Sequence, residues 1–324
     1  MEIMDPKRKQ EGLTMQADYH VHCEFSDDSV YPMEDVVTDA IGLGLEELCF
    51  TDHVDYGIKV DWDSGQEIVW RNGEPMANVD YPRYFAKITD MQEKYGDRIR
   101  IRRGLELGVQ SHTIPQFEAL TKKYPLDFAI LSIHQVRDEE FWNGEFLQGR
   151  TRREFNEAYY REMLRVVQSF KNYSVLGHMD LIARYDPEGG YPFDEVKDLI
   201  EEILKVVIAD GKGIEVNTSS VRYGLSDWQP STKILELYRD LGGRIITIGS
   251  DSHKPAHLAA HISAAKEMLK GLGFREFCTF YKGIRCFIRC EGEKESCGRH
   301  TETVLKPDDR QIMGIMGKAR SAQR

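Results

Sequence analysis

Short apolar runs alternate with longer stretches of helical periodicity along most of this chain. The runs are rich in Ile, Leu, Val and Phe and are bounded by Gly, Asp, Ser or Pro, which is typical of buried strands. The pattern predicts these strands: Tyr19–Cys23, Glu47–Asp52, Ile99–Val109, Asp127–His134, Ser174–Leu181, Gly213–Thr218 and Arg244–Ser250. It predicts these helices: Pro32–Leu43, Tyr81–Tyr95, Ile114–Lys123, Arg152–Phe170, Phe193–Asp210, Ser231–Leu241 and Pro255–Leu272.

This alternation predicts an α/β fold with a parallel sheet, because a helix between two strands lets them pair in the same direction. A chain that repeats the unit this often can close its sheet into a barrel. In such barrels the active site lies at the carboxyl ends of the strands, where all the following loops converge. Residues at predicted strand ends are therefore the candidates for function.

Histidines and carboxylates gather at these strand ends. The candidate metal ligands are His20, His22, Asp28, His53, Glu106, His134, His178, Asp251 and His253. Transition metals favour neutral imidazole and ionised carboxylate, and a charged Glu106 inside the run RRGLELGV would cost several kcal/mol unless it were paired or bound to metal. For each residue considered alone, the alternative interpretation is a buried histidine that pairs with a carboxylate and binds no metal. The occurrence of all nine residues at one face of the predicted barrel favours a metal-dependent hydrolase.

Composition narrows the class of protein. The chain has 324 residues, of which 41% are hydrophobic and 30% charged, as is ordinary for a globular enzyme. A formal net charge of -11 argues against a general nucleic-acid binder, although a local positive site stays open. No apolar run approaches membrane-spanning length, and the start MEIMDPKRKQEGLTMQ has no apolar stretch typical of a secretory signal. We therefore expect a cytoplasmic protein without a membrane partner.

The expected domain division is a flexible extension over 1–15, a barrel over 16–290 and a polar, poorly ordered tail over 291–324. Two long stretches, 54–79 and 135–149, lack clear periodicity. They are interpreted either as lids and substrate walls or as packed surface loops.

Six cysteines in a chain of this length, without an export signal, are interpreted as reduced thiols. One C-x3-C-x6-C-x2-H series leaves a second metal site conceivable, although it lacks the C-x2-C pairs of structural zinc sites. It consists of Cys286, Cys290, Cys297 and His300.

Six motifs in order resemble those of the PHP (polymerase and histidinol phosphatase) superfamily. They are HVHCEFSDDS, FTDH, GLELGV, ILSIHQV, GHMDL and GSDSH, and the resemblance runs from about Ala17 to Phe274. It implies a distorted seven-stranded (β/α)7 barrel, similar to a TIM barrel, which agrees with the predicted strands. It also implies three divalent transition-metal ions, for which zinc, iron and manganese are all suitable.

The ligand sets follow from the resemblance alone. The first ion would be held by His20, His22, Glu106 and Asp251, the second by Asp28, His53 and His253, and the third by Glu106, His134 and His178. Glu106 would bridge two ions, whereas Asp52 would orient His53 or its neighbours. Glu106, Asp251 and His253 are the expected catalytic residues.

Charge favours a phosphate monoester as the substrate. Three divalent ions against three carboxylates and one hydroxide leave roughly two positive charges, which a monoester dianion neutralises. Bound metals lower the pKa of water from roughly 16 toward about 7, and they clamp the attacking and leaving oxygens for in-line displacement. Arg184 and Arg222 follow the fifth and sixth predicted strands and are expected to grip the phosphate. Surface ion pairs are the alternative interpretation of these arginines.

Within the superfamily, the chain most resembles the stand-alone histidinol-phosphate phosphatases. The resemblance lies in a barrel without an attached polymerase, in SIHQVRDEEFWNGEF, and in the arginines of GHMDLIARYD and EVNTSSVRYG. It implies hydrolysis of L-histidinol phosphate to L-histidinol and phosphate, a step of histidine biosynthesis. The alternative is a PHP phosphodiesterase acting on nucleotides or nucleic-acid ends, which should show a basic groove with stacking aromatic residues. A small-molecule partner is expected rather than nucleic acid, and oligomeric state is left unpredicted.

Overall fold

The computed structural model describes residues 15–71 and 73–290 and contains a nearly closed barrel of parallel strands. Around the barrel, neighbouring strands are β1 (Ala17–Val21), β2 (Glu47–Phe50), β6 (Arg100–Gly108), β7 (Phe128–Ser132), β10 (Val175–Leu176), β11 (Gly213–Asn217) and β12 (Ile246–Gly249). A short strand, β3 (His53–Val54), follows β2 and also pairs with β6. The predicted α/β barrel of seven parallel strands is confirmed.

Hydrogen bonds bring the first and last strands of the barrel together. Asp18 is fully buried, and its carboxylate accepts hydrogen bonds from the backbone N–H of Ser250 at 2.9 Å and from the Ser250 hydroxyl at 2.5 Å. Further along, the backbone N–H of His22 donates to the carbonyl of Ser252 at 2.8 Å. The seam therefore fixes the loop after β12 against the end of β1.

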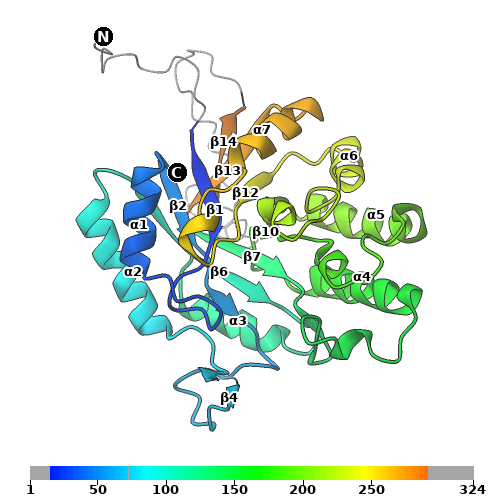
Figure 1. The fold of residues 1–324 in the computed structure, drawn as a ribbon, viewed down its shortest axis with the longest axis horizontal. Helices are drawn as coiled ribbons and strands as arrows, with labels where there is room; N and C mark the ends of the chain where they lie inside the picture. Colours follow the sequence, from blue (N-terminus) through cyan, green and yellow to red (C-terminus); the bar gives the residue numbers. More distant parts are fainter. Residues whose placement is uncertain (1–14, 72, 291–324) are drawn as a thin grey trace, which may run out of the picture.

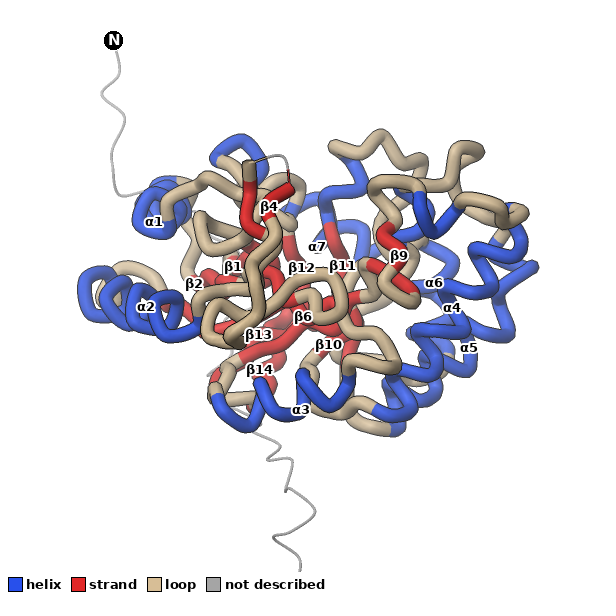
Figure 2. The backbone as a smooth tube through the Cα atoms, turned by 90° about the horizontal axis from the view of Figure 1, so that it is seen from below, coloured by secondary structure: helices blue, strands red, loops and turns tan. Residues whose placement is uncertain are grey.

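Helices surround the strands on the outside, as Figures 1 and 2 show from two directions. They are α1 (Met33–Gly42), α2 (Tyr81–Tyr95), α3 (Ile114–Lys123), α4 (Arg152–Ser169), α5 (Phe193–Ala209), α6 (Thr232–Asp240) and α7 (Ile262–Gly271). Short 3-10 helices are η1 (Glu145–Leu147), η2 (Leu181–Arg184), η3 (Thr218–Val221) and η4 (Pro255–His257). Helix α5 illustrates the packing, since Val196, Ile200 and Val207 recur at helical spacing and are buried. In the described part of the chain, no helix is long and apolar enough to cross a membrane.

Two predicted elements are wrong in extent. The helix predicted over Pro255–Leu272 is divided into η4 and α7, because Ala259 and His261 have left-handed φ angles of 56° and 60° that a continuous helix does not allow. The strand predicted over Ser174–Leu181 is only the two residues of β10. Its later apolar residues are buried in a turn and in η2 instead.

A C-terminal hairpin that the pattern did not predict packs across the N-terminal end of the barrel. It consists of β13 (Glu276–Tyr281) and β14 (Ile284–Arg289). The Tyr19 hydroxyl accepts a hydrogen bond from the N–H of Phe280 at 2.6 Å, and the carboxylate of Asp127 accepts one from the N–H of Lys282 at 2.8 Å. The hairpin therefore covers the end of the barrel opposite the candidate ligands.

The two long loops each contain a small hairpin. They are β4 (Trp70–Arg71) with β5 (Glu74–Pro75), and β8 (Gln135–Val136) with β9 (Glu139–Glu140). In the view of Figure 1, the β4 segment extends away from the barrel. Of the predicted cysteine series, Cys286 lies on β14 and Cys290 just beyond it, whereas Cys297, His300 and nearly all of both predicted extensions fall outside the described residues.

Candidate metal centre

The nine candidate ligands, although far apart in sequence, meet at the carboxyl ends of the barrel strands. His20 lies on β1, His53 on β3 and Glu106 on β6, so the strands themselves carry these three. The others lie in the segments that follow the strands: His22 and Asp28 after β1, His134 after β7, His178 after β10, and Asp251 and His253 after β12.

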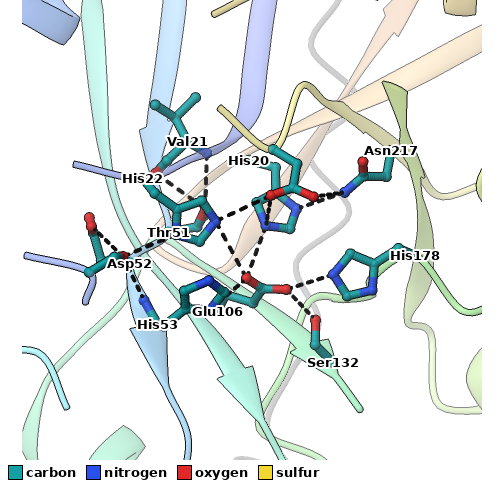
Figure 3. Close-up of polar contacts among 12 residues, drawn as sticks. His20, Val21, His22, Thr51, Asp52, His53, Glu106, Ser132, His178 and Asn217 are labelled. Atoms are coloured by element: carbon teal, nitrogen blue, oxygen red, sulfur yellow. Dashed lines mark hydrogen bonds and ion pairs between the residues drawn. The ribbon is translucent and has the colours of Figure 1, made fainter. Parts of the chain in front are cut away.

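Glu106 lies at the centre of this ring and is completely buried. Figure 3 shows its carboxylate between histidines from opposite sides of the barrel. Oε2 lies 3.0 Å from His20 Nε2, 3.4 Å from His22 Nε2 and 3.0 Å from His53 Nδ1. Oε1 lies 3.1 Å from His134 Nε2 and 2.8 Å from His178 Nε2. Each oxygen of one carboxylate therefore faces a different group of histidines.

The two aspartates lie on either side of His253. Asp251 is buried, and its Oδ1 lies 3.9 Å from His20 Nε2 and 3.7 Å from His22 Nε2. Asp28 Oδ2 lies 3.0 Å from His253 Nε2, and the Asp28 side chain is 53% exposed. Asp28 thus marks the solvent side of the ring, whereas Asp251 belongs to its buried side.

Four histidines are held from behind through Nδ1. The acceptors are Glu215 Oε1 for His20 at 2.6 Å, Ser26 Oγ for His22 at 3.1 Å, Asp55 Oδ1 for His134 at 2.8 Å, and the Asp251 carbonyl for His253 at 2.9 Å. A neutral imidazole that donates from Nδ1 carries its lone pair on Nε2. In all four rings Nε2 faces the centre, which is the arrangement of a metal-binding histidine.

Asp52 supports the ring through Ser26. The Ser26 hydroxyl donates to Asp52 Oδ1 at 2.7 Å, and Ser26 Oγ accepts a hydrogen bond from the backbone N–H of His53 at 3.2 Å. Burial raises the pKa of Asp52 to about 6, although the N–H of Cys23 and the Ser26 hydroxyl donate to the carboxylate. The Asp52 carboxylate therefore reaches His22 and the backbone of His53 through Ser26, and its orienting role stays a prediction.

Burial and the neighbouring charges act on the pKa values of the ring in opposite directions. Burial alone would lower the pKa of each histidine, but carboxylates raise the pKa of His20 and His53 well above the usual histidine value and that of His134 to about 9. Burial would raise the pKa of Glu106, but the surrounding histidines, His20 and His134 foremost, hold it well below its usual range. Burial lowers the pKa of His22 well below the usual histidine value, and neighbouring histidines lower it further. An ionised carboxylate and a neutral imidazole are the forms that bind metal.

Buried polar atoms without a hydrogen-bond partner test whether these residues fit metal ions. Among the described residues, such atoms at the ring are His20 Nε2, His22 Nε2, His53 Nδ1, His178 Nδ1, His253 Nε2 and Glu106 Oε2. A buried polar atom left unpaired costs about 1 to 3 kcal/mol, so this many at one place would be costly in the absence of a ligand. Groups with ligand atoms within 4.8 Å of one another include His20, His22 and Glu106, and separately Glu106, His134 and His178. The site fits divalent metal ions.

A cavity of about 470 Å³ opens over the ring, and both long loops form its walls. Lys59, Arg71 and Met76 line it from the first loop, and Glu140 and Trp142 from the second. The two loops are joined where Arg71 Nη1 lies 2.5 Å from Glu140 Oε2. Both long loops therefore form walls of the cavity rather than surface loops that pack away from it.

The two candidate phosphate-binding arginines lie in different environments. Arg184 lines the cavity, its side chain is only 6% exposed, and its Nη2 lies 3.2 Å from Asp251 Oδ2. Arg222 does not line the cavity, and it donates to the backbone carbonyls of Ser250 at 2.8 Å and Asp251 at 2.5 Å. Arg184 therefore faces the cavity, whereas Arg222 holds the backbone that carries Asp251.

Two supporting carboxylates were not among the predicted site residues. Glu215 is buried on β11, where it holds His20 Nδ1 and also accepts the backbone N–H of His178 at 3.0 Å. A glutamate inside the apolar strand GIEVN is the same signal that selected Glu106. Asp55, which holds His134, follows His53 by two residues, and nothing in the sequence separates it from a surface aspartate.

Known proteins match most of the described chain. A model of the PHP domain family matches residues 18–219. A histidinol-phosphatase of Lactococcus lactis is 34% identical over 266 residues, which cover 81% of this chain and 93% of that protein. A probable histidinol-phosphatase of Thermotoga maritima is 30% identical over 261 residues, or 79% of this chain and 92% of that protein.

One solved structure resembles the chain in both fold and sequence. It is the crystal structure of histidinol phosphate phosphatase from Lactococcus lactis in complex with zinc, L-histidinol and phosphate. The two structures align with a TM-score of 0.71 and 33% sequence identity, over 83% of this chain and 97% of that one.

Proposed function

The chain belongs to the PHP domain family, and we propose that it is a metal-dependent phosphomonoesterase that hydrolyses L-histidinol phosphate to L-histidinol and phosphate. The observation that carries the proposal is the buried carboxylate of Glu106 between five histidines at the floor of a cavity. The related Lactococcus lactis protein, whose structure holds zinc and both products of this reaction, supports the choice of substrate.

The ring would hold three divalent ions, for which zinc, iron and manganese are suitable. We assign the first to His20, His22, Glu106 and Asp251, the second to Asp28, His53 and His253, and the third to Glu106, His134 and His178. When bound, such ions neutralise phosphate charge and make hydroxide available at neutral pH. The proximity of ligand atoms supports the first and third sets most directly.

The chain's own residues would position the substrate. Glu106, Asp251 and His253 are the proposed catalytic residues, since they surround the floor of the cavity where the phosphate must enter. Arg184 is fixed there by hydrogen bonds from its Nε to Gln229 at 2.6 Å and from its Nη2 to Ser219 at 2.6 Å. A guanidinium held in one orientation binds phosphate oxygens without losing further side-chain freedom.

The cavity favours a small monoester over a nucleic-acid strand. The loops that carry Arg71 and Glu140 meet at its wall, so the path from the ring is bounded on that side. A terminal phosphate fits such a site, whereas a diester must also accommodate a group on a second phosphate oxygen.

A comparison of two substrates tests the proposal. Metal-replete protein should hydrolyse L-histidinol phosphate with kcat/KM at least about a hundredfold above that for a dinucleotide, a difference of about 2.7 kcal/mol in transition-state binding. A chelator should abolish both activities, and Glu106→Gln serves as the control for contaminating phosphatases. Comparable or faster cleavage of the dinucleotide would favour the phosphodiesterase instead.

A further inference from the structure

Lys59 is a buried lysine in the 54–79 loop that the proposed reaction leaves without a role. Its side chain is 8% exposed, and Nζ lies 2.6 Å from Asp27 Oδ1 and 3.0 Å from Asp55 Oδ2. Removing an ammonium group from water costs several kcal/mol unless carboxylates compensate it. The two carboxylates at Nζ supply that compensation at the wall of the cavity.

One of these carboxylates, Asp55, contacts a proposed ligand of the third ion. Asp55 uses Oδ2 for Lys59 and Oδ1 for His134 Nδ1, which lies 2.8 Å away. The opposite nitrogen, His134 Nε2, faces Glu106 Oε1 at 3.1 Å. Lys59 therefore fixes the carboxylate that sets the orientation of the His134 ring.

The other carboxylate, Asp27, is adjacent in sequence to a proposed ligand of the second ion. Asp27 immediately precedes Asp28, whose Oδ2 lies 3.0 Å from His253 Nε2 and 3.5 Å from His53 Nε2. Asp28 is the most exposed of the proposed ligands and lies in a turn after β1, so its neighbours must hold it in place. The ion pair with Lys59 ties this turn to the 54–79 loop.

Gly108 leaves the space in which Asp55 and His134 meet. A Cβ atom at this position would lie 1.9 Å from Asp55 Oδ1 and 2.9 Å from His134 Nδ1. Real Cβ atoms do not come so close to their neighbours, so any side chain at this point on β6 would displace the contact. The chain is thus shaped around the hydrogen bond between Asp55 and His134.

We propose that Lys59 is a positioning residue of the metal centre, which holds Asp28 through Asp27 and His134 through Asp55. The inference rests on the proposed function, because it takes the ring to be the metal centre. In this arrangement the 54–79 loop is part of the metal site as well as a wall of the cavity. Replacing Lys59 by a neutral side chain leaves two carboxylates without their shared counter-charge, so both ligands lose their support.

Metal retention in the absence of substrate tests this role. Metal-loaded wild-type protein, Lys59→Met and Lys59→Arg are dialysed against graded concentrations of a chelator, and ions per chain are counted by mass spectrometry. Lys59→Met should release metal at chelator concentrations about 10- to 100-fold lower than the wild type, the usual effect of losing an outer partner of a ligand. Lys59→Arg, which keeps the charge, should lie between the two.

Lys205 offers a matched control, because its Nζ lies 2.6 Å from Glu201 in an exposed ion pair on α5. Lys205→Met should retain metal like the wild type. If Lys59→Met does not fold, Asp27→Asn makes the same test, since it removes one partner of Lys59 at nearly constant shape. Asp27→Asn should also release metal earlier than the wild type.

Kinetics separate positioning from direct contact with the substrate. With a positioning role, excess metal restores kcat of Lys59→Met and leaves KM close to the wild-type value. Wild-type metal retention with a raised KM alone would overturn the proposal, because Lys59 would then bind the substrate. Unchanged retention in both Lys59→Met and Asp27→Asn would overturn it too. Because retention is measured without substrate, a wild type that fails to hydrolyse L-histidinol phosphate refutes the proposed function and leaves this test intact.

Discussion

Replacing Glu106 by glutamine keeps the shape of the side chain and removes one buried negative charge. Oε2 faces His20, His22 and His53 within 3.4 Å, and Oε1 faces two other histidines within 3.1 Å. A carboxylate placed between these groups can bind an ion with each oxygen. We therefore expect Glu106→Gln to lose more than one ion per chain.

The expected loss follows from simple electrostatics. Two unit charges about 4 Å apart interact by about 4 kcal/mol at the effective dielectric constant of about 20 that describes most protein sites. A loss of that size for each bridged ion weakens its binding by about three orders of magnitude. A residue that bound a single ion would weaken only that one.

Ions per chain, counted by mass spectrometry after gel filtration in metal-free buffer, measure the effect. The wild type should carry up to three ions, and Glu106→Gln should carry at most one. Glu140→Gln is a matched control, since Glu140 is also a buried carboxylate of the cavity but pairs with Arg71 instead of the histidines. A full complement of metal in Glu106→Gln would refute the bridge, and a similar loss in Glu140→Gln would refute its specificity.

Further expectations concern the surroundings of the ring. Arg184→Ala should lower kcat/KM by about one to three orders of magnitude, because it removes a charge-assisted contact of about 1.5 to 3 kcal/mol or somewhat more; wild-type kinetics would contradict phosphate binding by Arg184. Arg222→Ala should lower kcat/KM as well, through the Asp251 backbone that it holds, and equal activity would show that this support is dispensable. Gly108→Ala should release metal as readily as Lys59→Met, because its Cβ displaces Asp55 Oδ1, and wild-type retention would show that the contact relaxes. Chelation should lower the melting temperature in calorimetry, since an ion at a hundred times its Kd stabilises the fold by about 2.7 kcal/mol; an unchanged melting temperature would contradict metal binding in solution.

The helices could be predicted from the sequence, except where left-handed residues interrupt the last one. The predicted bounds of α2 and α3 are the observed ones. At α2 the Asp80 side chain caps the helix, and a proline lies in the first turn of each helix. No glycine or proline marks the left-handed Ala259 and His261, which break the predicted helix before α7.

The C-terminal hairpin carried a signal that was too weak to predict its two strands. Its strands are joined by Lys282 and Gly283, both with positive φ angles, of 51° and 71°. Such turns are more readily recognised from Asn-Gly or Asp-Gly. The residues EFCTFY and IRCFIR alone do not show that they close the end of a barrel, because that depends on distant residues such as Tyr19 and Asp127.

The candidate ligands could be predicted because each is an unusual residue at the end of an apolar strand. Their supports are different, since Asp55 and Glu215 act through contacts between segments far apart in sequence. An aspartate two residues beyond His53 is not distinguishable from a surface aspartate until the fold brings it to His134. The sequence pattern thus identified the residues that face the centre of the ring, but not the residues that fix their orientation.

The barrel and the loops contribute unequally to the rigidity of the centre. His20, His53 and Glu106 lie on strands, where backbone pairing with neighbouring strands fixes the Cα positions. Asp28 lies in a turn, so its carboxylate depends on the ion pair between the neighbouring Asp27 and Lys59. A ligand in a loop must lose more conformational freedom to bind an ion than a ligand on a strand. The proposed first ion therefore depends chiefly on the barrel, whereas the second and third also depend on the loop that forms the wall of the cavity.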